Sequence, residues 1–506
     1  MNEPREQQPG TSDGSIGDGD AGLAQAARDA DRLAFGPQLP ERLDLRACLA
    51  ATVLGVLTGA VAVLYRQALD GAIRLHDGAR ANLAMHGVAG WLGLLALTAA
   101  VGALARLLVE RFSPESAGSG IPSVEARLQD GSRLRWPRIL PVKFAGGVLA
   151  LSSGLVAGRE GPTIHIGASI GAALSEAFKL DRDDMRGLLA AGAAAGLAAA
   201  FNAPLAAILF IIEETRKQFR YTFRSYVGVI CASAASAMGM GLVGGTAPPM
   251  RIAALEQPLW LLPAFVLLGV AMGVLGVVFN RSLLGALDWT TKTFRRVPFV
   301  PALVVGGAIG ALAIVLPEAV GGGELLIPHL VARDLPLAML VLVAVLRFVG
   351  TMASYPVGVP GGIFAPMLAL ATAVGLAIGM VMEIALTAGG TPVPPSMAAA
   401  VAIAAMGGLF SATIRAPLVG VVLAVELTGA YALILPLLVT CVTAHVIAER
   451  LGGRPIYELL LERTLRLSGQ APFAPVSTET SSPVGIDDKP RPTQVRRRRR
   501  RRGGKA

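Results

Sequence analysis

Long apolar blocks, separated by short polar or Gly/Pro-rich stretches, fill the chain between positions 45 and 450. Examples are residues 91–105, 188–212, 337–346 and 417–446. A helix rises about 1.5 Å per residue, so about 20 apolar residues cross the core of a bilayer. About a dozen such blocks occur, several too short or too long for one clean span. The pattern predicts an all-α polytopic membrane protein with broken helices.

Composition supports the membrane class and argues against a soluble one. The 506 residues are 53% hydrophobic and only 16% charged, and the mean hydropathy is +0.59. Soluble proteins carry about 25% charged residues. Residues 1–40 are polar and contain no apolar run of the signal-peptide kind, so insertion is expected to depend on the spans themselves.

The three cysteines, Cys48, Cys231 and Cys441, lie far apart and make no CxxC spacing. They are interpreted as small core residues, and the spacing predicts neither a disulfide framework nor a metal site. No Walker-type phosphate loop and no HExxH occurs either, so an enzyme is not expected and no cofactor is predicted.

The net charge of +10 is concentrated at the C-terminus, where Lys489, Arg491, Arg496 to Arg502 and Lys505 carry ten positive charges and no acid intervenes. Basic segments that flank a membrane domain favour the cytoplasm, so both termini are predicted to be cytoplasmic. A solvated tail is the simplest interpretation, and a contact of Arg496 to Arg502 with anionic lipid is the alternative. Nucleic-acid binding is disfavoured because no aromatic residue interleaves with the arginines.

Four segments follow from these patterns. Residues 1–44 form a polar N-terminal leader, and 45–450 form the membrane body, with related halves at roughly 45–243 and 258–450. Residues 451–467 are predicted to form a short amphipathic helix at the interface. Residues 468–506 are predicted to be a disordered basic tail, which leaves no room for a C-terminal soluble regulatory domain.

The two halves share an internal repeat. Phe-Asn-Ala-Pro-Leu at 201–205 corresponds to Ile-Arg-Ala-Pro-Leu at 414–418, and each Pro is followed nine positions later by a glutamate, Glu213 or Glu426. A threonine follows two residues after each glutamate. Transporters are commonly built from two related halves, with the substrate site where helices break. The repeat alone leaves open whether the halves are parallel or inverted.

Small residues four positions apart also recur, which is typical of close helix packing in membranes. They are Gly154/Gly158, Gly192/Gly196, Gly269/Gly273 and Gly306/Gly310.

Three Gly/Pro-rich breaks carry the candidate chemistry: GSGIP at 118–122, GREGP at 158–162 and GGIFAP at 361–366. Each break ends in proline, which suits the first turn of a helix. The residues before it then present free N–H groups at a helix N-terminus, and glycine lets an ion approach the main chain. Several such N-termini aimed at one point would make an anion site without a full positive charge.

These segments, in this order and spacing over about residues 45–465, resemble the CLC family of chloride channels and chloride/proton antiporters. The resemblance implies an inverted-repeat helical bundle with broken helices at the midplane, a homodimer in the cell (inner) membrane, and one anion pathway per subunit. Chloride and protons would be the transported ions.

The resemblance also assigns site residues. It implies that the Ser119 hydroxyl, the backbone N–H groups of Ile363 and Phe364, and the Tyr431 phenol bind the anion. Serine at 119 and a tyrosine at 431 imply chloride rather than nitrate or fluoride. The supporting residues of the breaks are Gly118, Gly120, Pro122, Gly158, Arg159, Gly161, Pro162, Gly361, Gly362 and Pro366.

Glu160 matches the external gating glutamate of this family. A carboxylate beside helix N-termini can occupy an anion position, and protonation would free it to swing away. The alternative is a helix-capping glutamate in a buried salt bridge with Arg159. An ionisable group at this depth is functional by default.

Glu214 matches the internal proton-transfer position of the antiporters, where plain channels carry a non-ionisable residue. A chloride/proton antiporter is therefore the leading interpretation, and a passive chloride channel of the same fold is the alternative. Glu213 and Glu214 could instead be two interfacial carboxylates that face water. A membrane scaffold or sensor is a third reading, disfavoured because it predicts a large soluble domain.

Three further polar residues lie in apolar surroundings. His165 is interpreted as a satisfied packing histidine. Lys143 is expected to pair with a carboxylate or with carbonyls inside the bundle, and Arg415 is expected to be structural.

Overall fold

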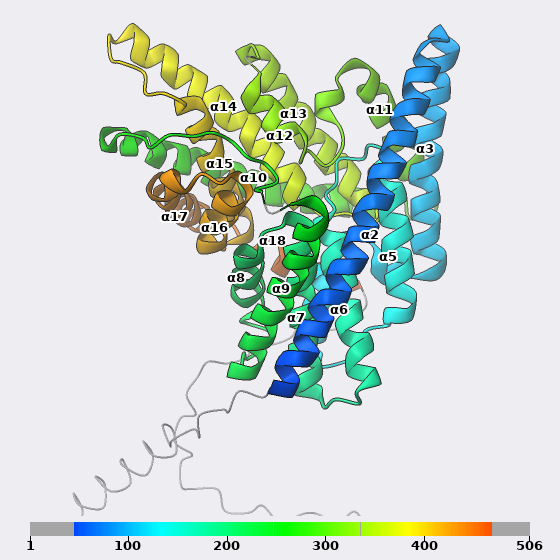
Figure 1. Cartoon of the computed structure of the whole chain (residues 1–506). Helices are drawn as coiled ribbons and strands as arrows, with labels where there is room; N and C mark the ends of the chain where they lie inside the picture. The colour runs from blue at the N-terminus through cyan, green and yellow to red at the C-terminus, as the bar shows by residue number, and fades with distance from the viewer. Residues whose placement is uncertain (1–44, 246, 334, 468–506) are drawn as a thin grey trace, which may run out of the picture.

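The computed structural model of the chain describes residues 45–245, 247–333 and 335–467, and it is helical with no β-strand in those ranges (Figure 1). The predicted leader (1–44) and basic tail (468–506) lie outside the described residues. The all-α prediction is confirmed for the part of the chain that the structure describes.

The first half contains the helices α2 (Leu45–Ala84), α3 (Gly87–Phe112), η1 (Pro114–Ser116), α4 (Ile121–Asp130), α5 (Trp136–Ser152), α6 (Glu160–Ala177), α7 (Arg182–Phe201), α8 (Pro204–Thr215) and α9 (Phe223–Gly244). The second half contains η2 (Leu259–Leu261), α10 (Leu262–Thr293), α11 (Val300–Val315), η3 (Pro317–Ala319), α12 (Leu326–Ala332), α13 (Leu337–Ser354), η4 (Tyr355–Val357), α14 (Phe364–Ala388), α15 (Met397–Ile414), α16 (Pro417–Thr428), η5 (Tyr431–Leu433) and α17 (Ile434–Arg450). The last helix is α18 (Ile456–Leu467).

Eight helices in the described ranges are long and apolar enough to cross a membrane, fewer than the dozen apolar blocks counted from the sequence. The number is smaller because breaks divide some apolar blocks into helices that are too short to span a bilayer. The block at 188–212 is cut between Phe201 and Pro204 into α7 and α8, and the block at 417–446 is cut after Thr428. With 12 residues each, α8 and α16 are about 18 Å long and reach only part of the way across a bilayer.

The two halves pack their helices in the same pairs. In the first half α6 packs on α7, α7 on α9, and α2 on α9. In the second half α14 packs on α15, α15 on α17, and α10 on α17. The correspondence confirms the repeat that the sequence predicts.

Helices α8 and α16 show how the halves are oriented. The carboxylate of Glu426, near the end of α16, accepts hydrogen bonds from the N–H groups of Leu205 (3.1 Å) and Ala206 (2.7 Å) in the first turn of α8. Near the end of α8, Glu213 accepts one from the Val419 N–H of α16. Each helix therefore ends beside the beginning of the other, so the repeated helices run antiparallel and the repeat is inverted.

Three of the four small-residue pairs lie in tight helix contacts. An added Cβ at Gly196 would stand 2.1 Å from the carbonyl oxygen of Thr163 on α6, and one at Gly192 would stand 2.2 Å from that of Gly167. Gly269 and Gly273 face α17, and Gly306 and Gly310 face α3. The fourth prediction, Gly154/Gly158, is wrong: both residues lie in the link between α5 and α6, where Gly154 adopts a φ of +82°.

Helix α18 begins at Ile456, later than the predicted 451, and it is not confined to an interface. It packs against α4 of the first half and against α10 and α15 of the second. The side chains of Ile456 and Tyr457 are fully buried. The start of α18 therefore lies inside the bundle, between the two halves.

The cysteines are not all core residues as the sequence predicts, because Cys48 and Cys231 are only half-buried. Cys48 of α2 and Cys231 of α9, far apart along the chain, are close enough for their thiols to interact, and all three cysteines are free. Only Cys441 is completely buried.

Candidate anion and proton site

The three Gly/Pro-rich breaks meet in the centre of the molecule and are joined through their backbones. Gly158 and Gly362 exchange two hydrogen bonds, of 2.9 and 2.7 Å. The Gly118 N–H donates to the Val359 carbonyl (3.0 Å), and the Gly361 N–H donates to the Gly118 carbonyl (3.1 Å). Helices α4, α6 and α14 therefore begin from one shared cluster of loops, as an anion site made from helix N-termini requires.

Glu160, the first residue of α6, is completely buried, and its carboxylate lies on the N-terminus of α14. The Phe364 N–H donates to its Oε1 at 2.6 Å. A Cβ at Gly158 would stand 2.0 Å from Oε2 of Glu160, and one at Gly362 would stand 2.2 Å from Oε1. Glycine at these two positions makes the room that the carboxylate occupies.

Arg159 does not pair with Glu160. Its guanidinium forms an ion pair with Glu324 at 2.6 Å. Glu160 thus keeps an Oε2 that is buried and has no hydrogen-bond partner among the described residues. The buried salt bridge considered as the alternative for Glu160 is therefore not formed.

The loop before α4 is held by a buried lysine. Lys143 is completely buried, and its Nζ donates to the Gly118 carbonyl at 2.7 Å. This confirms the prediction that Lys143 pairs inside the bundle, with a carbonyl as the partner. Ser119 next to it is 1% exposed and interacts with the Tyr355 phenol.

An aromatic cluster fixes Phe364, whose N–H binds Glu160. Its ring packs against Phe201, Phe210, Phe410 and Tyr457, with centroid distances of 6.4, 5.2, 5.0 and 5.8 Å. Tyr457 is fully buried, yet its hydroxyl has no hydrogen-bond partner among the described residues. A buried phenol of this kind can donate to a bound anion.

Tyr431 is not brought to the other predicted residues. It begins η5, its side chain is 67% exposed, and its N–H donates to the Gly429 carbonyl. The exposed phenol lies apart from the buried Ser119 and Phe364, with which the prediction groups it. The structure places Tyr457 against Phe364 instead, so the choice of Tyr431 from the sequence is corrected to Tyr457.

Glu214, in the last turn of α8, faces a second carboxyl group that the sequence interpretation missed. Glu125 of α4 is 1% exposed, and its carboxyl group is within hydrogen-bonding reach of that of Glu214. Neither oxygen of Glu125 has a donor among the described residues. Two ionised carboxylates cannot donate to each other, so one proton held between them would supply the missing hydrogen bond.

Tyr457 is close enough to interact electrostatically with Glu160 as well as with Glu214 and Glu125. The sequence contains weak signals for both of the residues that sequence analysis does not identify. Glu125 is a carboxylate beside apolar Val124 and near apolar Leu128, and Tyr457 lies at the start of the amphipathic helix.

Two predictions for single polar residues have different outcomes. Arg415 donates to the carbonyls of His445 and Gly453, a structural role as expected. His165 is completely buried against Gly120, but neither of its ring nitrogens has a hydrogen-bond partner among the described residues. It is a packing histidine, and the prediction that its hydrogen bonds are satisfied is wrong.

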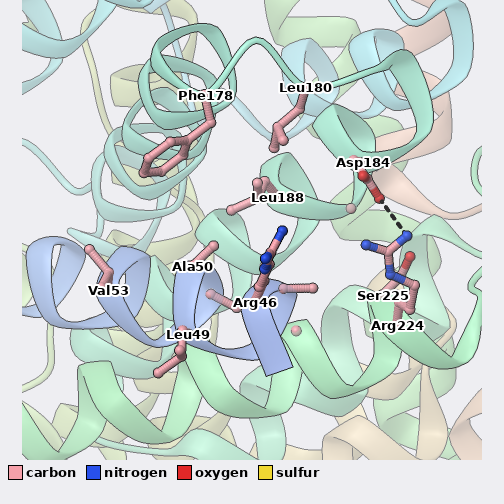
Figure 2. A pocket seen from close by; sticks show the side chains of 15 residues that line it. Arg46, Leu49, Ala50, Val53, Phe178, Leu180, Asp184, Leu188, Arg224 and Ser225 are labelled. Atoms are coloured by element: carbon pink, nitrogen blue, oxygen red, sulfur yellow. Dashed lines mark ion pairs between the residues drawn. The ribbon is translucent and has the colours of Figure 1, made fainter. Parts of the chain in front are cut away.

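A cavity of about 710 Å³ lies away from this site, between the start of α2, the region of α6 and α7, and α9 (Figure 2). Its walls are mostly apolar, for example Leu49, Phe178 and Leu188, and the ion pair between Arg224 and Asp184 (3.5 Å) lies at one side. None of the predicted site residues lines it. The cavity is therefore separate from the candidate site.

The fold defines a multi-pass membrane protein with inverted halves and a buried centre from which helices α4, α6 and α14 begin. A protein-family model described as voltage gated chloride channel matches residues 101–449. The chain belongs to this family.

Named relatives are similar over most of their length. The H(+)/Cl(-) exchange transporter ClcA of Vibrio parahaemolyticus is 43% identical over 385 residues, which are 74% of this chain and 80% of that protein. ClcA of Salmonella paratyphi B is 41% identical over 431 residues, 84% of this chain and 90% of that protein. The crystal structure of a slow cyanobacterial Cl-/H+ antiporter matches with a TM-score of 0.80 and 36% identity, covering 85% of this chain and all of that one.

Proposed function

We propose that this protein is a secondary active transporter that exchanges chloride for protons across the membrane. The observation that carries the proposal is the position of the Glu160 carboxylate, which accepts the Phe364 N–H at the N-terminus of α14. A helix N-terminus favours any anion, so carboxylate and chloride compete for one place. Protonation removes the charge of the carboxylate, which lets it leave and admits chloride.

Chloride would be held by groups that donate without carrying a full charge. We assign this role to the Ser119 hydroxyl, the N–H groups of Ile363 and Phe364, and the Tyr457 hydroxyl. Such donors bind an anion strongly enough to strip its water and weakly enough to release it. The two curated relatives are named H(+)/Cl(-) exchange transporters, which supports chloride as the anion.

Protons would use two carboxyl stations. Glu160 is the external gate and proton acceptor, and Glu214, with Glu125 as its partner, is the internal transfer station. Tyr457 interacts with all three, so the proton and chloride routes run beside each other. The proposal needs no cofactor, because protonation of the Glu160 carboxylate by itself couples proton movement to chloride movement.

The biological setting is part of the same proposal. We place the protein in the cell (inner) membrane as a homodimer, with one pathway per subunit and both termini in the cytoplasm. The arginine tail, Arg496 to Arg502, would contact anionic lipid. Its positive charge favours the cytoplasmic side.

The direct test is proton movement by the purified protein in liposomes under an imposed chloride gradient. An antiporter uses the chloride gradient to drive protons uphill, which a pH electrode records in a weakly buffered medium. A passive chloride channel would dissipate the chloride gradient without moving protons against their own gradient, and that result would overturn the proposal.

Tyr457→Phe should weaken chloride binding about three- to tenfold, because it removes one buried donor worth about 1 kcal/mol and keeps the ring that packs on Phe364. Calorimetric titration with chloride measures the change. Tyr431→Phe is the matched control and should bind chloride as the unmodified protein does. Weakened binding in the Tyr431 variant alone would reverse the assignment of the two tyrosines.

A further inference from the structure

A cluster of ion pairs joins the end of α8 to the first turn of α18. Lys217 Nζ lies 3.0 Å from Oε2 of Glu458, and Arg454 Nη2 lies 2.7 Å from Oε1 of the same carboxylate. Each oxygen of Glu458 therefore has its own cation. Arg454 also binds Glu462.

This cluster adjoins the internal carboxyl pair. Lys217 follows Glu214 by three residues, and Glu458 follows Tyr457 directly. Both Lys217 and Glu458 interact electrostatically with Glu214 and with Glu125. Helix α18, which bears Glu458, also packs against α4, which bears Glu125.

Exposure places the cluster at the boundary with solvent. The side chain of Lys217 is 54% exposed and that of Glu458 is 30% exposed, whereas Glu125 is 1% exposed. A proton that passes between water and the carboxyl pair on this side moves in the field of the cluster.

Lys217 is attracted by two groups of carboxylates, one that it binds directly and one with which it interacts electrostatically. Its ammonium is a compact charge with three donors on a flexible stem. In this structure it binds Glu458, and the alternative is the Glu125–Glu214 pair, which becomes more attractive to a cation each time it loses a proton.

We propose that Glu458 is a positioning residue that holds Lys217 away from the Glu125–Glu214 pair and thereby sets the pH at which the pair takes up a proton. The proposal rests on the proposed function, in which Glu214 is the internal proton station. Both charges of the ion pair act on the carboxyl pair, and with opposite signs: Lys217 favours its ionised form and Glu458 favours its protonated form.

Other charged groups on the packed elements belong to the same field. They are Glu213 and Arg216 at the end of α8, Arg454 and Glu462 beside Glu458, and Asp288 of α10, which pairs with Arg463 of α18. Lys217 and Glu458 are among the charges that act most strongly on both Glu214 and Glu125. Glu213 is also among the strongest for Glu214, whereas Asp288 is among the strongest for neither.

Glu458 itself stays ionised during neutral-pH exchange. Partial burial raises the pKa of its carboxyl group, but the hydrogen bonds from Arg454 and Lys217 outweigh this and hold the pKa below its usual range. A group with a lowered pKa keeps its ion pair above that pKa and loses it as the pH falls. The Glu458–Lys217 pair therefore persists at neutral pH, so a shift of the exchange profile there reports on the carboxyl pair.

The test compares Glu458→Gln with Lys217→Gln in liposomes, with only the internal pH varied. Glu458→Gln releases Lys217 toward the carboxyl pair and removes a negative charge, so the pH profile of proton-coupled exchange should move to lower pH. Lys217→Gln should move it to higher pH. We expect each shift to be about half a pH unit, because partly exposed charges are screened. Shifts in the same direction, or no shift in either variant, would overturn the proposal.

Asp288→Asn is the matched control. It removes a negative charge that also pairs with an arginine of α18 (Arg463, 2.8 Å) but is not among the charges that act most strongly on Glu214. The pH profile of proton-coupled exchange by Asp288→Asn should not shift. Unchanged chloride affinity in all three variants shows that the anion site has kept its structure.

A background variant separates this proposal from the proposed function. In Glu214→Gln, chloride should flow without protons, and adding Lys217→Gln should leave the pH dependence of that flow unchanged. If Lys217→Gln still shifts the pH dependence of chloride flow in the Glu214→Gln background, the ion pair acts on another group. That result overturns the proposal and leaves the proposed function intact. Proton pumping by Glu214→Gln itself would refute the proposed function instead.

Discussion

Glu214→Gln is expected to abolish chloride-driven proton movement while chloride still flows. Glutamine keeps the size of the side chain and can hydrogen bond to Glu125, but it cannot take up and release a proton. A positioned acid or base commonly contributes about 100-fold or more to proton transfer, so proton flux should fall by at least that factor. Parallel recordings with a pH electrode and a chloride electrode on the same liposomes measure both ions.

The neighbouring glutamate provides the control. Glu213 accepts the Val419 N–H at the start of α16 and is not among the groups that act most strongly on Glu125. Glu213→Gln should therefore keep proton coupling, because an amide oxygen can still accept that hydrogen bond. Proton pumping that survives in Glu214→Gln would show that the internal station has been assigned to the wrong residue.

Glu160→Gln is expected to give chloride flux that is independent of protons and nearly independent of pH. The amide has no charge with which to compete for the N-terminus of α14, so the site stays open to chloride at every pH. It also carries no proton to the outside. Proton flux should drop about 100-fold or more, and the chloride flux should vary little across the pH range in which the unmodified protein responds.

Chloride efflux from liposomes at a series of external pH values measures this effect. Glu318→Gln is a suitable control, since Glu318 pairs with Arg333 (3.4 Å) and makes no contact with the anion site. That variant should keep the pH response. Persistent pH-dependent exchange in Glu160→Gln would rule out Glu160 as the gate.

The pattern of the chain predicts the general fold well because the bilayer constrains it strongly. A backbone break at membrane depth survives only where it is buried in protein or lines a path, so the breaks before Pro122, Pro162 and Pro366 already indicated where a site would form. The structure brings these breaks together through hydrogen bonds between Gly158 and Gly362 and between Gly118 and Gly361.

The sequence says less about which side chains pack beside each Gly/Pro-rich break. It contains six tyrosines, and nothing local distinguishes the phenol that reaches Phe364. The family resemblance favours Tyr431, which is exposed, whereas Tyr457 is buried because α18 inserts between the halves. The start of α18 packs in the core, and this depends on apolar surfaces of α4, α10 and α15 that no local pattern reveals.

Local sequence patterns are also silent about which charged groups meet. The sequence places Glu214 at the end of an apolar helix, but its contact with Glu125 requires the folded chain to bring α8 close to α4, which packs against α7 and α18. The sequence also leaves open whether the two halves are parallel or inverted. The reciprocal contacts of Glu213 and Glu426 show that α8 and α16 are antiparallel, so the halves are inverted.

By itself, the sequence determined that this protein is helical, lies in a membrane, consists of two related halves and carries Glu160 in a helix-breaking turn. These features follow from local periods and breaks, because each hydrogen bond of a membrane helix is made within the helix. Only the tertiary structure decided that Tyr457 rather than Tyr431 faces Phe364, that Glu125 accompanies Glu214, and that Glu458 binds Lys217. Those contacts join residues far apart in the chain, and they exist because helices from both halves pack around one centre.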